Sequence, residues 1–157
     1  MHGSVTLHMR AASEPIWDLV SDVTKIGMFS PETFEAQWLD EATGPAVGAR
    51  FRGHVRRNGR GPVYWTTCVV TACAPGREFA FTVGEGDKAL NTWRYVLEPK
   101  DDGTDVTESF QLKDVAWLQL YWMLLGPWRG RTNERGMRTT LERIRDAVEA
   151  PSAPPAD

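Results

Sequence analysis

Residues 104–112, TDVTESFQL, alternate in a way that predicts a β-strand with one polar and one apolar face. Val106, Phe110 and Leu112 share the apolar face, and Glu108 stands among them. If this strand is half-buried, the Glu108 carboxylate points toward the interior, where an unpaired charge is costly. The sequence therefore predicts that a polar group meets Glu108 inside the protein.

Further strand patterns precede this segment along the chain. They are SVTLHMRA at 4–11, FEAQWLD at 34–40, ARFRGHVRR at 49–57, VYWTTCVVTAC at 63–73, EFAFTVG at 78–84 and NTWRYVLEP at 91–99. Turns rich in glycine, proline or aspartate separate the later strands, and no helical pattern interrupts them. Strands at this regular spacing predict a meander with antiparallel pairing.

Helical patterns occur after the first strand and at the carboxyl end. Apolar residues at helical spacing between 16 and 23 predict one or two short helices. Met137, Leu141, Ile144 and Val148 step by four, three and four, which predicts a long amphipathic helix. The fold expected from this order is an α+β domain, with a curved antiparallel sheet wrapped around the long C-terminal helix and two short helices after the first strand.

Length and composition favour one ordinary globular domain. At 157 residues we expect a single domain at 1–149, followed by a disordered Pro/Ala-rich tail at 150–157. A net charge of -3 argues against a nucleic-acid partner. The amino terminus lacks the build of a signal peptide, so we expect a cytoplasmic protein. The longest apolar run, VAWLQLYWMLLG, is too short for stable membrane insertion.

Cysteine and histidine spacing gives no framework for a metal. Cys68 and Cys73 would lie on opposite faces of one strand, which makes a disulfide between them improbable. His2, His8 and His54 are scattered, without paired ligand spacing. We expect no metal and no cofactor, and we interpret Cys68 as a small buried hydrophobic residue.

Aromatic side chains gather at the inward positions of the predicted strands. The facing half of the long helix carries Gly130 and Asn133 where bulky side chains are expected. This combination predicts a cavity for a small, mostly apolar ligand with a few polar anchors. The predicted ligand-binding residues are Phe51, Trp65, Thr67, Phe81, Trp93, Tyr95, Phe110, Trp122, Gly130, Asn133 and Met137.

The inward face of the strand at 63–73 is ambiguous. Alternation brings either Trp65 and Thr67 or Thr66 and Cys68 to the cavity, but not all four. We predict the first pair as ligand contacts.

The segment at 115–128 carries several tryptophans, including Trp122. Its aromatic side chains are typical of a lid over the cavity or a homodimer contact, and equally of a helical extension that packs on the sheet edge. A membrane-interface patch is a further alternative, but no lysine or arginine accompanies the run until Arg129.

The sequence also resembles a known family. The order of elements and the motifs IWDLVSDV, VGARFRG, WTTCVV, PGREFAFTVG, WRYVLEP, GTDVTESF and ERGMRTTLERI are similar to the START-like, or SRPBCC, superfamily, and most similar to its polyketide cyclase/dehydrase branch. The resemblance covers about residues 4–149. It implies a helix-grip fold with a deep internal cavity. No catalytic residue follows from it, because the branch has no shared catalytic signature and includes both carriers and enzymes.

Glu108 has two interpretations. It could be a general acid or base, or a ligand anchor, with a pKa raised by an apolar pocket. Alternatively, it forms a structural ion pair with an inward arginine of the long helix, such as Arg131 or Arg135. We favour the ion pair, because ion-pair networks also place carboxylates on inward faces.

Three functions follow from these patterns. The first is binding of a small hydrophobic molecule, aromatic or polyketide-like, between the sheet and the C-terminal helix. The second is a polyketide cyclase/dehydratase-type enzyme that uses Glu108 and a hydroxyl such as Tyr95 or Thr67 for proton transfer. The third is a protein-interaction module of the co-chaperone or toxin type, which also occurs among START-like domains.

Overall fold

The computed structural model describes residues 2–56, 61–113 and 116–150, with the backbone alone at 116–132. The elements in chain order are β1 (His2–Met9), α1 (Ser13–Ser21), η1 (Val23–Lys25), α2 (Ile26–Phe29), β2 (Thr33–Trp38), β3 (Arg50–Arg56), β4 (Val63–Ala74), β5 (Glu78–Val83), η3 (Gly86–Lys88), β6 (Asn91–Lys100), β7 (Gly103–Leu112) and α3 (Ala116–Glu149).

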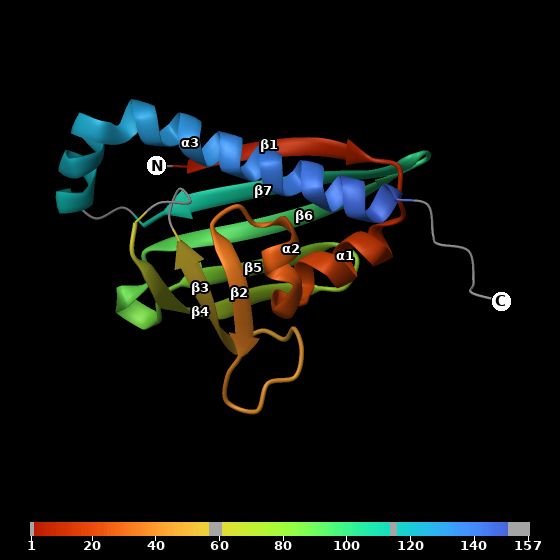
Figure 1. Cartoon of the computed structure of the whole chain (residues 1–157), viewed down its shortest axis with the longest axis horizontal. Coiled ribbons are helices and arrows are strands. Elements are labelled where there is room, and N and C mark those ends of the chain that lie inside the picture. The colour runs from red at the N-terminus through yellow and green to blue at the C-terminus, as the bar shows by residue number, and fades with distance from the viewer. Residues whose placement is uncertain (1, 57–60, 114–115, 151–157) are drawn as a thin grey trace.

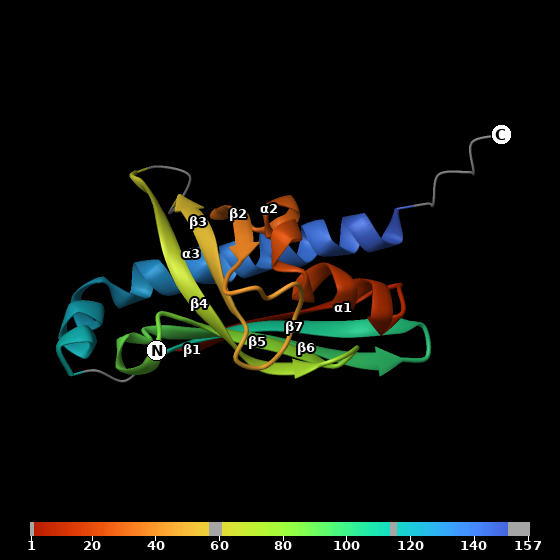
Figure 2. The same cartoon turned by 90° about the horizontal axis from the view of Figure 1, so that it is seen from below.

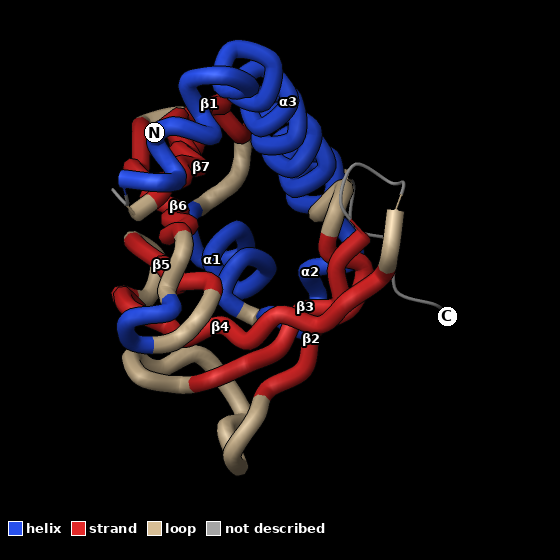
Figure 3. The backbone as a smooth tube through the Cα atoms, turned by 90° about the vertical axis from the view of Figure 1, so that its left-hand side faces the viewer, coloured by secondary structure: helices blue, strands red, loops and turns tan. Residues whose placement is uncertain are grey.

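The seven strands form one antiparallel sheet in the order β1-β7-β6-β5-β4-β3-β2 (Figure 1). The sheet is strongly curved, and α1, α2 and α3 all lie on its concave side (Figure 3). Register shifts in β2 and β4 mark bulges, which bend strands locally. The predicted α+β helix-grip architecture, including two short helices after the first strand, is confirmed.

Helix α3 packs along the sheet through the predicted apolar stripe. It contacts β1 and β7 on the sheet and also the short helices α1 and α2 (Figure 2). Met137, Leu141 and Ile144 are almost completely buried, and Val148 packs against them at the edge of the core. The predicted tail lies outside the described residues from 151 onward, so its disorder stays a prediction.

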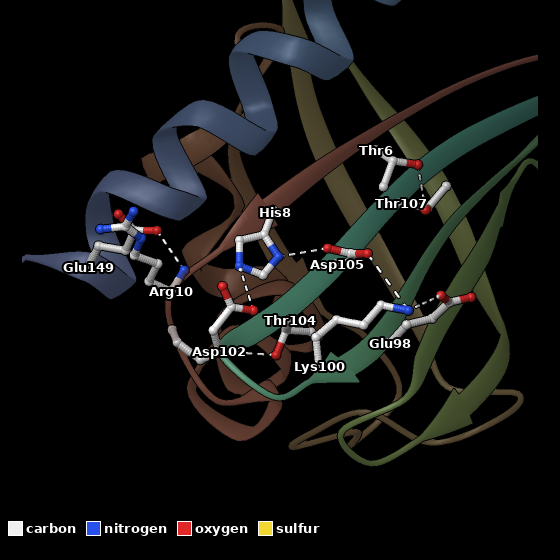
Figure 4. A network of polar contacts seen from close by, with 11 residues as sticks. Thr6, His8, Arg10, Glu98, Lys100, Asp102, Thr104, Asp105, Thr107 and Glu149 are labelled. Atoms are coloured by element: carbon white, nitrogen blue, oxygen red, sulfur yellow. Dashed lines mark hydrogen bonds and ion pairs between the residues drawn. The ribbon is translucent and has the colours of Figure 1, made fainter.

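A polar network on the outer face of the sheet shows which way β7 is turned (Figure 4). Asp105 of β7 is bonded to His8 of β1, with 2.7 Å between Oδ1 and Nδ1. The hydroxyls of Thr107 and Thr6 are 2.8 Å apart on the same pair of strands. Alternate residues of a strand point to opposite faces of the sheet. The residues next to Asp105 and Thr107 in β7 therefore point to the concave side.

The turn between β6 and β7 depends on a glycine. Gly103 has a φ of +153°, and a Cβ atom there would lie 2.1 Å from the carbonyl oxygen of Met9. A side chain would therefore strain the backbone and displace the end of β1. This turn also sets the register in which Tyr95 of β6 faces Glu108 of β7.

We expect Gly103→Ala to lower the free energy of unfolding by about 1 to 3 kcal/mol, because the strained φ and the backbone clash add. Gly44→Ala is the matched control, since nothing lies within 4 Å of a Cβ atom at Gly44. Urea denaturation of both variants measures the difference. Equal stability of the two variants would contradict this account of the turn.

Candidate functional site

A cavity of about 160 Å³ lies between the concave face of the sheet and α3. Strands β3 to β7 supply one wall, α3 supplies the opposite wall, and the link from α2 to β2 closes one side. We call it the central cavity. Tyr64 lines it and is 39% exposed, so the cavity reaches solvent beside this residue.

Aromatic rings form the sheet wall, as predicted. Phe51, Phe81, Trp93 and Tyr95 all line the central cavity. Phe51 and Phe81 meet edge to face, with 5.1 Å between ring centroids. Phe110 is buried but does not line the central cavity. It is the cross-strand neighbour of Trp93, with 5.6 Å between the two ring centroids.

Small and polar residues form the helix wall. The predicted Asn133 and Met137 line the central cavity, together with Gly136 and Thr140. A Cβ atom at Gly136 would lie 3.9 Å from Pro31 Cγ, which leaves room for at least one carbon atom. The predicted contacts Gly130 and Trp122 lie in the part of α3 for which only the backbone is described. Whether the segment at 115–128 is a lid, a dimer contact or part of the core therefore stays a prediction.

Two predicted ligand contacts are wrong. Trp65 and Thr67 lie on the outer face of β4, because the register pairs inward Phe51 with Cys68, and only residues in phase with Cys68 face inward. Trp65 is 39% exposed and stacks on His54, with 4.2 Å between centroids. The alternative pair, Thr66 and Cys68, lines the central cavity.

Cys68 is not placed to act as a nucleophile. Burial raises the pKa of its thiol to about 12, and a contact from Thr66 offsets only part of this shift. The thiol is therefore protonated at neutral pH, as expected of a buried hydrophobic residue.

Glu108 lies on the inner face of β7, as its strand pattern predicts, and is only 3% exposed. The Tyr95 hydroxyl donates a hydrogen bond to Glu108 Oε1 at 2.9 Å, across the β6–β7 pair. Glu108 Oε2 is buried and has no hydrogen-bond partner among the residues that the structure describes. Burial raises the pKa of the carboxyl to about 8, although the hydrogen bond from Tyr95 acts in the opposite direction. The site thus holds a carboxylic acid that is mostly neutral at pH 7.

The predicted ion pair with Arg135 is wrong. Arg135 is exposed and, with Glu134 and Arg138, lines an open polar groove between α3 and β1. Arg131 lies outside the described side chains. Helix geometry turns Arg135 away from the central cavity, because Met137, two residues along the same helix, faces inward.

Asn91 is a polar residue of the central cavity that the sequence analysis missed. It shares the inward face of β6 with Trp93 and Tyr95, and its buried Oδ1 atom has no hydrogen-bond partner in the described part of the chain. The alternation of NTWRYVLEP could have identified it, since the same period placed Trp93 and Tyr95 inward.

Within the described ranges, His, Cys, Asp and Glu side chains form no group of three or more that could hold a metal ion. None of the described helices has the length and apolarity needed to cross a membrane.

Comparison with known proteins gives one family match. A family model described as polyketide cyclase/dehydrase and lipid transport matches residues 2–149. No curated protein matches the chain.

Several solved structures share the fold. A polyketide cyclase-like protein from Corynebacterium glutamicum is 26% identical, with 95% of this chain and 89% of that chain covered and a TM-score of 0.58. A START superfamily protein from Mycobacterium smegmatis is 18% identical, with 94% and 97% covered and a TM-score of 0.70. The di-domain ARO/CYC protein StfQ from the steffimycin biosynthetic pathway is 14% identical, with 94% of this chain and 50% of that chain covered and a TM-score of 0.72.

The buried acid predicts an unusual pH dependence of stability. The pKa of Glu108 is raised in the folded protein from 4.5 to about 8, so the unfolded chain releases this proton first as the pH rises. Glu108 therefore destabilises the fold progressively between about pH 4.5 and pH 8. We expect Glu108→Gln to be more stable than the wild type by roughly 2 to 5 kcal/mol at pH 8 to 9, and by much less at pH 4.5.

Denaturation curves at several pH values measure this difference. Glu98→Gln, at an exposed position of β6, is the control and should show no such trend. A large loss of stability in Glu108→Gln at pH 7 would instead show that the carboxylate is ionised and paired with a cation.

Proposed function

The chain belongs to the polyketide cyclase/dehydrase and lipid transport family, and from this premise we propose that it binds a small hydrophobic molecule, aromatic or polyketide-like, in the central cavity. The observation that carries the proposal is an unfilled space with aromatic walls at the place where α3 presents Asn133 and Gly136. Protein interiors are normally close-packed, so a retained void of this size is consistent with a ligand site.

The size and lining of the central cavity indicate the class of ligand. An apolar cavity of about 150 Å³ accepts a single aromatic ring such as benzene. At about 160 Å³, the central cavity suits a one-ring compound in the described conformation. The opening beside Tyr64 supports entry from solvent without unfolding of the sheet.

Acid–base catalysis is the second candidate, and the Tyr95–Glu108 pair favours it. A carboxylic acid with a pKa of about 8 can both donate and accept a proton near neutral pH. Glu108 lines the central cavity, so a bound molecule would come within reach of Oε2. Thr67, proposed from the sequence as a second proton-transfer group, faces outward, whereas Tyr95 remains in place.

Native mass spectrometry of copurified compounds separates binding from catalysis. Under binding alone, the wild type and Glu108→Gln should retain the same compound. A mass difference equal to one water molecule between the two retained compounds would favour a dehydratase. The interaction-module hypothesis gains no support, since the central cavity is neither filled nor sealed.

Gly136 offers a test of the binding proposal. We expect Gly136→Leu to fill the central cavity and to reduce the affinity for acetophenone, a one-ring compound, at least 10-fold. Gly136→Ala is the matched control. It should leave binding nearly unchanged and stabilise α3 by up to about 1 kcal/mol, because glycine is unfavourable within a helix.

Calorimetric titration measures the affinity, and circular dichroism checks that both variants are folded. Unchanged binding in a folded Gly136→Leu variant would show that acetophenone binds elsewhere.

A further inference from the structure

Two polar atoms in the central cavity have no partner among the described residues. In the described part of the chain, three buried side-chain polar atoms lack a hydrogen bond, and two of them, Glu108 Oε2 and Asn91 Oδ1, belong to residues that line this cavity. The third, Trp17 Nε1, belongs to α1. Buried polar groups are nearly always hydrogen-bonded, so two exceptions in one cavity point to a ligand.

The two atoms stand at separate places along the sheet wall. Asn91 is four residues from Tyr95 on β6, and Glu108 faces Tyr95 across the strand pair. At about 3.3 Å per residue, this places the Cα atoms of Asn91 and Tyr95 about 13 Å apart. Trp93 lies between them on the same face and offers a flat apolar surface.

The two atoms also differ in hydrogen-bond character. Tyr95 donates to Oε1 of Glu108, so the proton of the neutral acid resides on Oε2 and is available to an acceptor in the central cavity. The amide oxygen of Asn91 is an acceptor and requires a donor. A ligand that satisfies both must therefore carry an acceptor and a donor at different positions.

The surroundings of Glu108 favour its neutral form. Val5 of β1 is its cross-strand neighbour, and Met137 and Thr140 of α3 line the same cavity. The titratable groups that line it from other described elements are Tyr95 of β6, Tyr64 and Cys68 of β4 and Glu32 before β2. None of these groups is a cation, and burial raises the pKa of Glu108 to about 8.

We propose that Glu108 and Asn91 are two polar anchors that select an uncharged ring compound, with a hydrogen-bond acceptor at Glu108, a donor at Asn91 and the ring against Trp93. This proposal rests on the binding function inferred above. A ligand carboxylate beside Glu108 would meet no described cation, and burial of an unpaired charge is costly. An amine would force Glu108 to ionise inside the apolar wall.

Two neutral probes of nearly equal size test the Asn91 anchor. We expect the wild type at pH 6.5 to bind 4′-hydroxyacetophenone roughly 3- to 10-fold more tightly than acetophenone, because only the first supplies a donor to Asn91. In Asn91→Leu this preference should disappear, while the affinity for acetophenone changes less than 2-fold. Calorimetry provides both constants, and thermal denaturation confirms that the variant is folded.

Acetophenone, which does not ionise, tests the Glu108 anchor. We expect its affinity for the wild type to fall about 10-fold between pH 6.5 and pH 9, as the acid loses the proton that it donates. Glu108→Gln keeps a donor in its amide and should bind equally at both pH values. Glu108→Leu keeps no donor and should bind weakly at both.

Each outcome has a defined meaning. Equal binding of the two neutral probes, or no effect of Asn91→Leu on their ratio, overturns this proposal and leaves the binding function intact. Tighter binding of 4-hydroxybenzoate or tyramine than of 4′-hydroxyacetophenone overturns the selection for an uncharged ligand. If no probe binds the wild type, this proposal and the binding function both fail.

Discussion

The orientation of β7 is the constraint on which the other features depend. This strand is paired on both sides, with β1 and β6, so a shift of one residue would turn its apolar face to solvent and expose Val106 and Phe110. The same alternation puts Asp105 and Thr107 into the outer network and carries Glu108 inward. The buried acid is thus a direct consequence of the phase that buries the core.

The central cavity arises where the packing of α3 changes character. Leu141 and Ile144 fill the space against the sheet, but toward the amino end of the helix the small or polar residues Gly136 and Asn133 face the cavity beside Met137. The space between α3 and the sheet is therefore well packed toward the carboxyl end of the helix and unfilled toward its amino end. Retained space and unpartnered polar atoms both reduce stability, which is typical of sites that are kept for function.

Membership of the family identifies the fold of this protein but not its ligand or its reaction. The same fold serves cyclases, dehydrases and lipid transporters, so chemistry has to be argued from the side chains that line the cavity. Here those side chains are Tyr95, Glu108 and Asn91, arranged around Trp93. They combine a neutral acid, an amide acceptor and a flat aromatic surface, which together define a ligand by its hydrogen-bonding pattern as well as by its size.

Local periodicity was sufficient to predict the strands, the apolar stripe of α3 and the inward direction of Glu108, because each depends only on spacing within one element. It could not decide between Trp65 and Cys68, since both faces of β4 carry apolar side chains and only the pairing with Phe51 of β3 selects one. Nor could it identify the partner of Glu108. That partner is Tyr95, because the turn at Gly103 sets the register of β6 against β7. The periodicity of one strand shows which face a residue is on, but the register decides which residue of the next strand lies opposite it.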